Sequence, residues 1–215
     1  MTVWEPLTES VGIYRSKQYP LYEDSLRLVE FARIHAFDRV LDLGTGNGIL
    51  AIYAAALYGG TYTGIDTDAD ALELAANSAA RNGQSISFQR IDVLDSPDRL
   101  GRGQFDHILM NPPYFTSGDP GTRAAARHAD DDLLTAWCGA AFQLLNNGGK
   151  LFVCYSANRL APLFRSLDQN RLAPKRMELR CLGNTATLAL VEARKLGGDG
   201  LQITVTGMAT KEKIG

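Results

Sequence analysis

Apolar and polar residues alternate along the chain with two different periods, which predict a series of strands and helices. From about residue 38, short apolar runs rich in branched side chains predict strands at 39–44, 61–66, 86–92, 105–110, 150–155, 177–182 and 186–194. Amphipathic or alanine-rich segments between them predict helices at 48–58, 68–83, 131–145 and 158–170. Strands that alternate with helices in this way predict a parallel sheet with helices on both faces.

The last two expected strands must run antiparallel to each other. Only Gly183–Thr185 separates them, whereas a parallel crossover needs a dozen or more residues. The segment 22–36, before the first strand, is an amphipathic helix that should cover one face of the sheet. A short extra strand is expected at 201–207. We therefore expect an α/β fold whose mostly parallel sheet ends in an antiparallel strand.

Composition agrees with a folded chain and does not indicate a strongly basic nucleic-acid binder. The 215 residues are 45% hydrophobic and carry a formal net charge of −2, which argues against intrinsic disorder. Charge is uneven, because residues 1–107 carry 9 basic and 15 acidic groups while residues 108–215 carry 13 and 9. Seven basic residues gather within 150–180, namely Lys150, Arg159, Arg165, Arg171, Lys175, Arg176 and Arg180. Such a cluster indicates either a solvated surface or an anion-facing patch.

Targeting signals and metal motifs are not evident in the sequence. The N-terminus lacks the basic and apolar regions of a secretory signal, and no stretch of about 20 apolar residues predicts a membrane span. The three cysteines, Cys138, Cys154 and Cys181, are scattered and do not form a zinc-type spacing. We expect a cytoplasmic protein without a structural metal.

A glycine-rich loop follows the first expected strand. It reads Asp42-Leu43-Gly44-Thr45-Gly46-Asn47-Gly48 and leads into a helix. Glycines permit a tight turn and a close approach of a ligand to the main chain, at the sheet edge where open α/β sheets bind ligands. The spacing departs from the dinucleotide pattern GxGxxG, and the Asp42 carboxylate would repel a pyrophosphate. A cationic or zwitterionic ligand is favoured instead.

Two further acids follow the next two strands. Asp66 ends the second strand, where a carboxylate can accept both hydroxyls of a ribose. Asp92 ends the third strand, where a carboxylate can accept from an exocyclic amine such as adenine N6. Either residue alone could simply cap a loop or helix. Three acids at successive strand ends favour a nucleoside-containing ligand.

This arrangement resembles the class I S-adenosylmethionine-dependent methyltransferases over roughly residues 38–192. The resemblance implies a Rossmann-like, seven-stranded sheet with an antiparallel last strand and S-adenosyl-L-methionine as the cofactor. It implies that Asp42, Gly44, Thr45, Gly46 and Gly48 surround the methionine part, that Asp66 holds the ribose and that Asp92 holds the adenine amine.

The fourth expected strand ends in a second motif, Asn111-Pro112-Pro113-Tyr114. Two prolines stiffen the chain and direct two acceptors, the Asn111 side chain and the Pro112 carbonyl. Two convergent acceptors suit a planar NH2 group, whose delocalised lone pair must be turned toward the methyl donor. Catalysis would then come from positioning and electrostatics, with the Tyr114 ring stacking an extruded base.

This motif resembles N-methyltransferases that act on adenine N6, protein glutamine or rRNA guanine N2. The resemblance implies that Asn111, Pro112, Pro113 and Tyr114 are catalytic and that Asn111 also contacts the cofactor. The longer pattern, which adds Phe115, Arg123, Arg127 and His128, is most similar to the bacterial tRNA(Val) adenine-37-N6 methyltransferase family. Phe115, Arg123, Arg127 and His128 are candidate substrate contacts, the last three in a loop at 117–132. The arginines could contact RNA phosphates or merely pair with Asp130–Asp132.

We expect an S-adenosylmethionine-dependent enzyme that methylates an exocyclic amine, namely N6 of an adenine in tRNA, with RNA as its partner and no membrane association. Protein-glutamine N5 and rRNA guanine-N2 methylation stay open as alternatives, and a non-catalytic cofactor-binding module is disfavoured by the intact Asn111 motif. Oligomeric state and target nucleotide stay open. The expected division is an N-terminal helical segment at 1–37 that covers the sheet and site entrance, a methyltransferase domain at 38–194 and an extension at 195–215.

Overall fold

The computed structural model describes residues 2–21, 23–112 and 123–208, and the side chains of these residues except 123–129 and 208. The strands are β1 (Val3–Pro6), β2 (Gly12–Arg15), β3 (Arg39–Leu43), β4 (Thr61–Asp66), β5 (Ser87–Arg90), β6 (Phe105–Met110), β7 (Leu145–Ser156), β8 (Leu172–Leu182), β9 (Thr185–Lys195) and β10 (Gln202–Met208). The helices are α1 (Glu23–Phe31), α2 (Ile49–Tyr58), α3 (Ala69–Arg81), α4 (Ser96–Leu100), α5 (Arg123–Leu144), the 3-10 turn η1 (Ala157–Arg159) and α6 (Leu160–Gln169).

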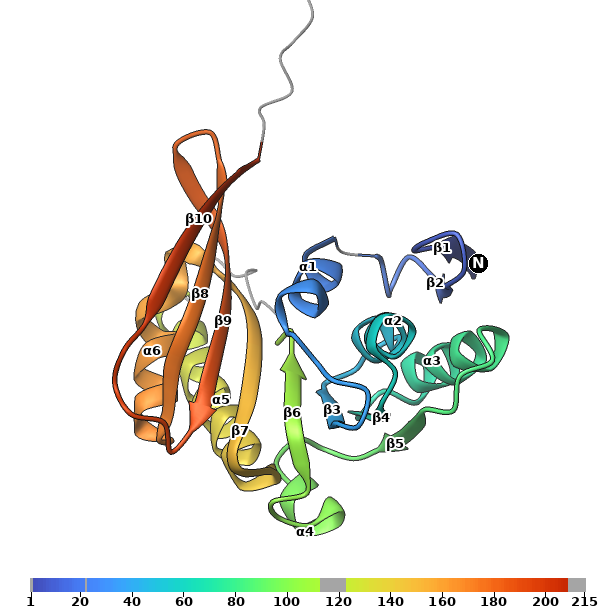
Figure 1. The fold of residues 1–215 in the computed structure, drawn as a ribbon, viewed down its shortest axis with the longest axis horizontal. Helices are drawn as coiled ribbons and strands as arrows, with labels where there is room; N and C mark the ends of the chain where they lie inside the picture. Colours follow the sequence, from blue (N-terminus) through green and yellow to red (C-terminus); the bar gives the residue numbers. More distant parts are fainter. Residues whose placement is uncertain (1, 22, 113–122, 209–215) are drawn as a thin grey trace, which may run out of the picture.

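One eight-stranded sheet organises the fold (Figure 1), with strand order β10-β8-β9-β7-β6-β3-β4-β5. All neighbouring strands pair in parallel except β9, which is antiparallel to both β7 and β8. The predicted mostly parallel sheet with an antiparallel last member is confirmed for the seven strands β3–β9. The expected extra strand at 201–207 is present as β10, which pairs in parallel with β8 and raises the strand count from seven to eight.

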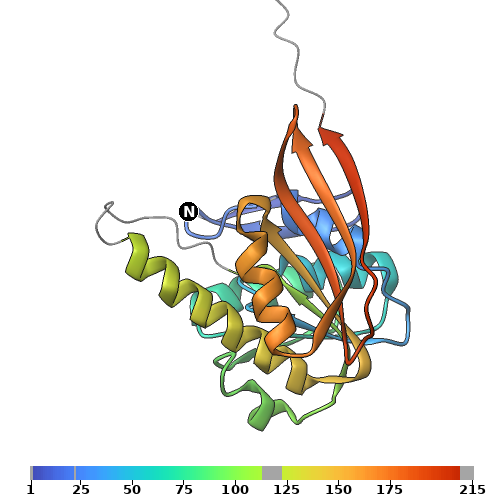
Figure 2. The same ribbon diagram turned by 90° about the vertical axis from the view of Figure 1, so that its left-hand side faces the viewer.

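Helices cover both faces of the sheet and bury two apolar layers against it (Figures 1 and 2). Helices α1, α2 and α3 contribute Leu28, Ile52 and Ala79 to one cluster, which also contains Phe152 of β7. Helices α5 and α6 contribute to the other, with Cys138 and Leu163. The α/β layering predicted from the alternating pattern is therefore observed. Among the described helices, none is both long and apolar enough to cross a membrane.

The N-terminal segment differs from the helical segment expected for 1–37. A two-stranded hairpin, β1–β2, precedes helix α1, which ends at Phe31 and not at 36. The hairpin is fixed to α3 because the Asn82 side chain bonds both polar groups of the Gly12 backbone. The Arg81 guanidinium also stacks on Trp4 and Tyr14. Strands of four residues are too short to show a clear period in the sequence.

Helix α5 also begins earlier than expected. The sequence interpretation placed a loop at 117–132, but the helix starts at Arg123 and continues to Leu144. The stretch Arg-Ala-Ala-Ala-Arg at 123–127 has high helix propensity, which explains the extension. Arg123, Arg127 and His128 therefore belong to the first turns of a helix and not to a loop.

Candidate functional site

The glycine loop connects β3 to α2 at the carboxyl edge of the sheet. Gly44, Gly46 and Gly48 all have positive φ, at 76°, 53° and 82°. A Cβ on Gly44 would lie 2.7 Å from the Trp137 ring, and one on Gly48 would lie 2.8 Å from the Ala75 Cβ. A Cβ on Gly46 would meet nothing within 4 Å. The loop is thus closely packed at its two ends and open at its centre, where a ligand can approach the backbone.

Strand β4 holds the loop in place. The backbone N–H groups of Gly44 and Thr45 both donate to the Ile65 carbonyl, at 3.0 and 2.8 Å. The Gly46 N–H donates to Asp66 Oδ2 at 2.9 Å, and the Asp68 N–H donates to Asp66 Oδ1 at 3.0 Å. Each carboxylate oxygen has two lone pairs, so Asp66 keeps acceptor capacity on both oxygens. Asp66 therefore lies beside Gly46, as expected for one ligand that touches both.

Asp42 is completely enclosed beneath the loop. Its Oδ2 accepts from Thr45 Oγ1 at 2.7 Å and from the Ala51 N–H at 3.2 Å. Burial raises the pKa of Asp42 to about 7, against the opposing effect of these two hydrogen bonds, and the charge of Asp66 adds to the increase. In this conformation Asp42 anchors the loop to α2, and a direct contact with the cofactor stays a prediction.

Asp92 lies near Asp66, because the Ile91 N–H donates to the Asp66 carbonyl at 3.0 Å. The Asp92 side chain is exposed, and its Oδ1 accepts from the Leu94 N–H at 2.9 Å. This hydrogen bond caps a turn, which is the structural role that the sequence left open for Asp92 beside ligand binding. The remaining lone pairs face no partner among the described residues and are accessible to an exocyclic amine.

Asn111 follows β6 and is held by a residue that the sequence interpretation missed. The Asn111 Nδ2 donates to Ser25 Oγ of helix α1 at 3.2 Å. The Asn111 Oδ1 is buried and accepts no hydrogen bond from the described part of the chain. Ser25 is only 3% exposed, and a polar residue on the buried face of an amphipathic helix was the available signal. Within the described residues, the contact leaves the carbonyl oxygen of Asn111 without a donor.

The structure describes the other residues of the Asn111 motif and the expected substrate contacts only in part. Pro112 is buried, whereas Pro113, Tyr114 and Phe115 lie outside the described residues. Arg123, Arg127 and His128 are placed by their backbone in α5, and their side chains are not described.

Ion pairs reduce the basic character of the cluster at 150–180. Arg159 pairs with Asp130 at 3.3 Å and with Asp131 at 2.5 Å. Lys150 and Arg176 both pair with Glu192, at 3.3 and 2.6 Å. Much of the cluster therefore has anionic partners within the chain. This favours a solvated surface over an anion-facing patch.

Comparisons with known proteins agree with this geometry. The methyltransferase small domain family matches residues 24–170. The tRNA1(Val) (adenine(37)-N6)-methyltransferase of Vibrio vulnificus (strain YJ016) is 34% identical over 151 residues, which are 67% of this chain and 59% of that protein. The chain thus spans less than two thirds of the length of this relative.

Solved structures show the same fold. TrmN from Thermus thermophilus superimposes with a TM-score of 0.61 and 28% identity, over 80% of this chain and 48% of that chain. A predicted O-methyltransferase from Agrobacterium tumefaciens superimposes with a TM-score of 0.70 and 20% identity, over 87% and 90% of the two chains. The second similarity is informative about the fold alone.

Proposed function

The chain belongs to the methyltransferase small domain family, and from that premise we propose that it transfers a methyl group from S-adenosylmethionine to an exocyclic amine. The substrate we propose is adenine N6 in a tRNA, and the cytoplasm is the compartment where it would act. The name of the Vibrio vulnificus relative supports the choice of tRNA.

The residues around the glycine loop fit S-adenosylmethionine. Gly46 offers open backbone beside the Asp66 carboxylate, which retains lone pairs for ribose hydroxyls. Asp92 offers an exposed carboxylate for an adenine amine. Acidic side chains also favour the positive charge of a sulfonium compound over a pyrophosphate. When bound there, the cofactor supplies an electrophilic methyl group.

The chain's own contribution is to position the target amine. Asn111 Oδ1 is a buried acceptor without a partner among the described residues, and such an atom is costly unless a ligand pairs with it. An NH2 group that donates to this oxygen is oriented and its lone pair becomes less delocalised. This role requires no general base, so rate enhancement would rest on proximity and electrostatics.

The main support for the proposal is Asn111 Oδ1, which is buried and has no partner among the described residues. Asn111 follows β6, at the same ends of the strands as the glycine loop that follows β3. The test is transfer of tritiated methyl groups into total tRNA, total rRNA, DNA and release factors, followed by nucleoside and amino-acid analysis. We expect N6-methyladenosine in tRNA with the wild-type chain and none with Asn111→Ala. If the label appears as N2-methylguanosine in rRNA or as N5-methylglutamine in a release factor, the proposed substrate is wrong and the labelled molecule is the substrate. Absence of label from all four would contradict the activity.

A further inference from the structure

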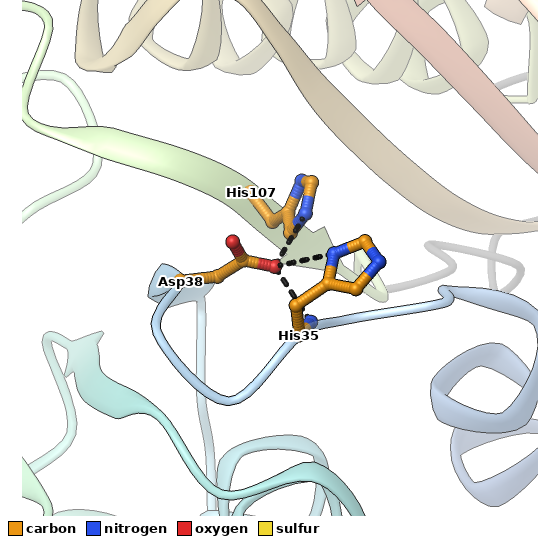
Figure 3. A group of neighbouring side chains, drawn as sticks. All are labelled: His35, Asp38 and His107. Carbon is orange, nitrogen blue, oxygen red and sulfur yellow. Dashed lines mark hydrogen bonds and ion pairs between the residues drawn. The ribbon is translucent and has the colours of Figure 1, made fainter.

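Two histidines and one aspartate form a cluster (Figure 3). The cluster lies toward the amino-terminal ends of the strands, whereas the glycine loop follows the carboxyl-terminal end of β3. His35 and Asp38 belong to the connection between α1 and β3, and His107 belongs to β6. Asp38 precedes β3 and Gly44 follows it, so about 20 Å of extended chain separates Asp38 from the glycine loop. The cluster is therefore separate from the proposed methyl-transfer site.

The three side chains converge on one carboxylate oxygen. Asp38 Oδ2 lies 3.0 Å from His107 Nε2 and 3.3 Å from His35 Nδ1. The three ligand atoms lie within 4.8 Å of one another. The same oxygen also accepts from the His35 backbone N–H at 2.6 Å. Three nitrogens thus share an oxygen with two lone pairs, which is crowded for hydrogen bonding alone.

The two distances from the Asp38 oxygen are compatible with a metal centre. Bonds of about 2.0–2.1 Å in a tetrahedral zinc site place neighbouring ligand atoms roughly 3.3 Å apart. The two nitrogen–oxygen distances, 3.0 and 3.3 Å, are close to that edge length. Imidazole and carboxylate ligands together suit zinc and the neighbouring divalent transition metals better than magnesium or calcium.

In contrast to the expectation from the sequence of no structural metal, we propose that His35, Asp38 and His107 bind one divalent transition-metal ion of the zinc type. The His107 side chain is 9% exposed and Asp38 is 20% exposed, whereas His35 is 79% exposed. The site is therefore buried on one side and open to water on the other, which leaves a fourth position for solvent. The ion would join the α1–β3 connection to β6 and would stabilise the folded state by binding to it.

The test uses the full chain without an affinity tag, after removal of metals with a chelator. Titration with Co²⁺, followed by visible absorption and equilibrium dialysis, measures stoichiometry and affinity, and Zn²⁺ competition shows whether zinc takes the same site. All variants carry Cys181→Ser, because this partly exposed thiol could itself bind the probe. We expect one equivalent of Co²⁺ with the spectrum of a tetrahedral nitrogen- and oxygen-ligated centre.

His35→Ala is the deciding variant, because the exposed imidazole can be removed without disturbing the core. We expect it to bind Co²⁺ at least ten-fold more weakly and to lose the increase in thermal midpoint that Zn²⁺ produces. Asp98→Asn, which removes an exposed carboxylate elsewhere, should retain both effects. If the Cys181→Ser parent binds less than one equivalent, or if His35→Ala binds as tightly as the control, the proposal is overturned. These measurements do not depend on methyl transfer.

Discussion

The hydrogen bond between Asn111 and Ser25 predicts that a helix residue outside the Asn-Pro-Pro-Tyr motif controls the rate of methyl transfer. Asn111 Nδ2 donates to Ser25 Oγ at 3.2 Å, and the buried Oδ1 has no hydrogen-bond partner among the described residues. A flipped amide would present two N–H donors to a target that is itself a donor. Ser25→Ala removes the acceptor that favours the productive orientation.

The expected loss follows from the energy of one hydrogen bond. A net contribution of about 1 kcal/mol is typical, and each 1.4 kcal/mol changes a rate by about ten-fold. We expect kcat of Ser25→Ala to fall roughly five-fold, with nearly unchanged KM for both substrates. The fold should tolerate the change, because alanine is the strongest helix former.

Two further variants separate the hydrogen bond from packing. Ser25→Thr keeps the hydroxyl and should recover much of kcat, whereas Ser25→Cys keeps the volume with a poorer acceptor and should behave like Ser25→Ala. Single-turnover transfer at saturating S-adenosylmethionine measures the step directly, and calorimetry measures cofactor affinity. Full kcat in Ser25→Cys, or weakened cofactor binding with an intact single-turnover rate, would refute the positioning role.

Four other predictions address the same site. Asn111→Ala should abolish methyl transfer with cofactor affinity largely intact by calorimetry, and loss of binding would contradict its assigned role. Asp66→Ala should weaken cofactor binding at least ten-fold, because it removes the expected ribose acceptor and the partner of the Gly46 N–H; unchanged affinity would assign the ribose elsewhere. Asp42 has a pKa of about 7 in the folded state, above its ordinary value of 3.8, so its contribution to stability is present below pH 4 and lost as the pH rises through 7. Asp42→Asn should flatten that decline in urea melts, and an identical pH dependence would show that another group causes it. Charge reversal at Arg123 and Arg127 should lower RNA affinity and reduce its salt dependence, measured by filter binding, and an unchanged slope would exclude phosphate contacts.

Local patterns predicted the central strands well. The strands at 61–66 and 105–110 have the predicted bounds, since the first ends at Asp66 and the second is followed directly by Asn111. The antiparallel pairing of β8 and β9 followed from the short connection alone. The loop conformation followed from the glycine spacing, and three positive φ angles bear it out.

Non-local contacts could not be predicted in the same way. Ser25 and Asn111 are 86 residues apart, and the fold alone brings them within hydrogen-bond distance. Trp137, which packs on Gly44, comes from the middle of α5 and carries no motif. His35 and Asp38 reach His107 only because β3 and β6 pair side by side. A spacing rule for metal ligands within one segment therefore misses this cluster.

The N-terminal segment contacts both parts of the proposed site. Its helix α1 supplies the Ser25 hydroxyl that orients Asn111. Its hairpin supplies the Tyr14 carbonyl, which accepts from Asn47 Nδ2 of the glycine loop at 3.4 Å. The segment 1–37 thus contacts both the loop proposed to hold the cofactor and the residue proposed to hold the target amine. Because both groups must keep a fixed relation for in-line transfer, a short N-terminal segment that touches each of them can align the two halves of the site.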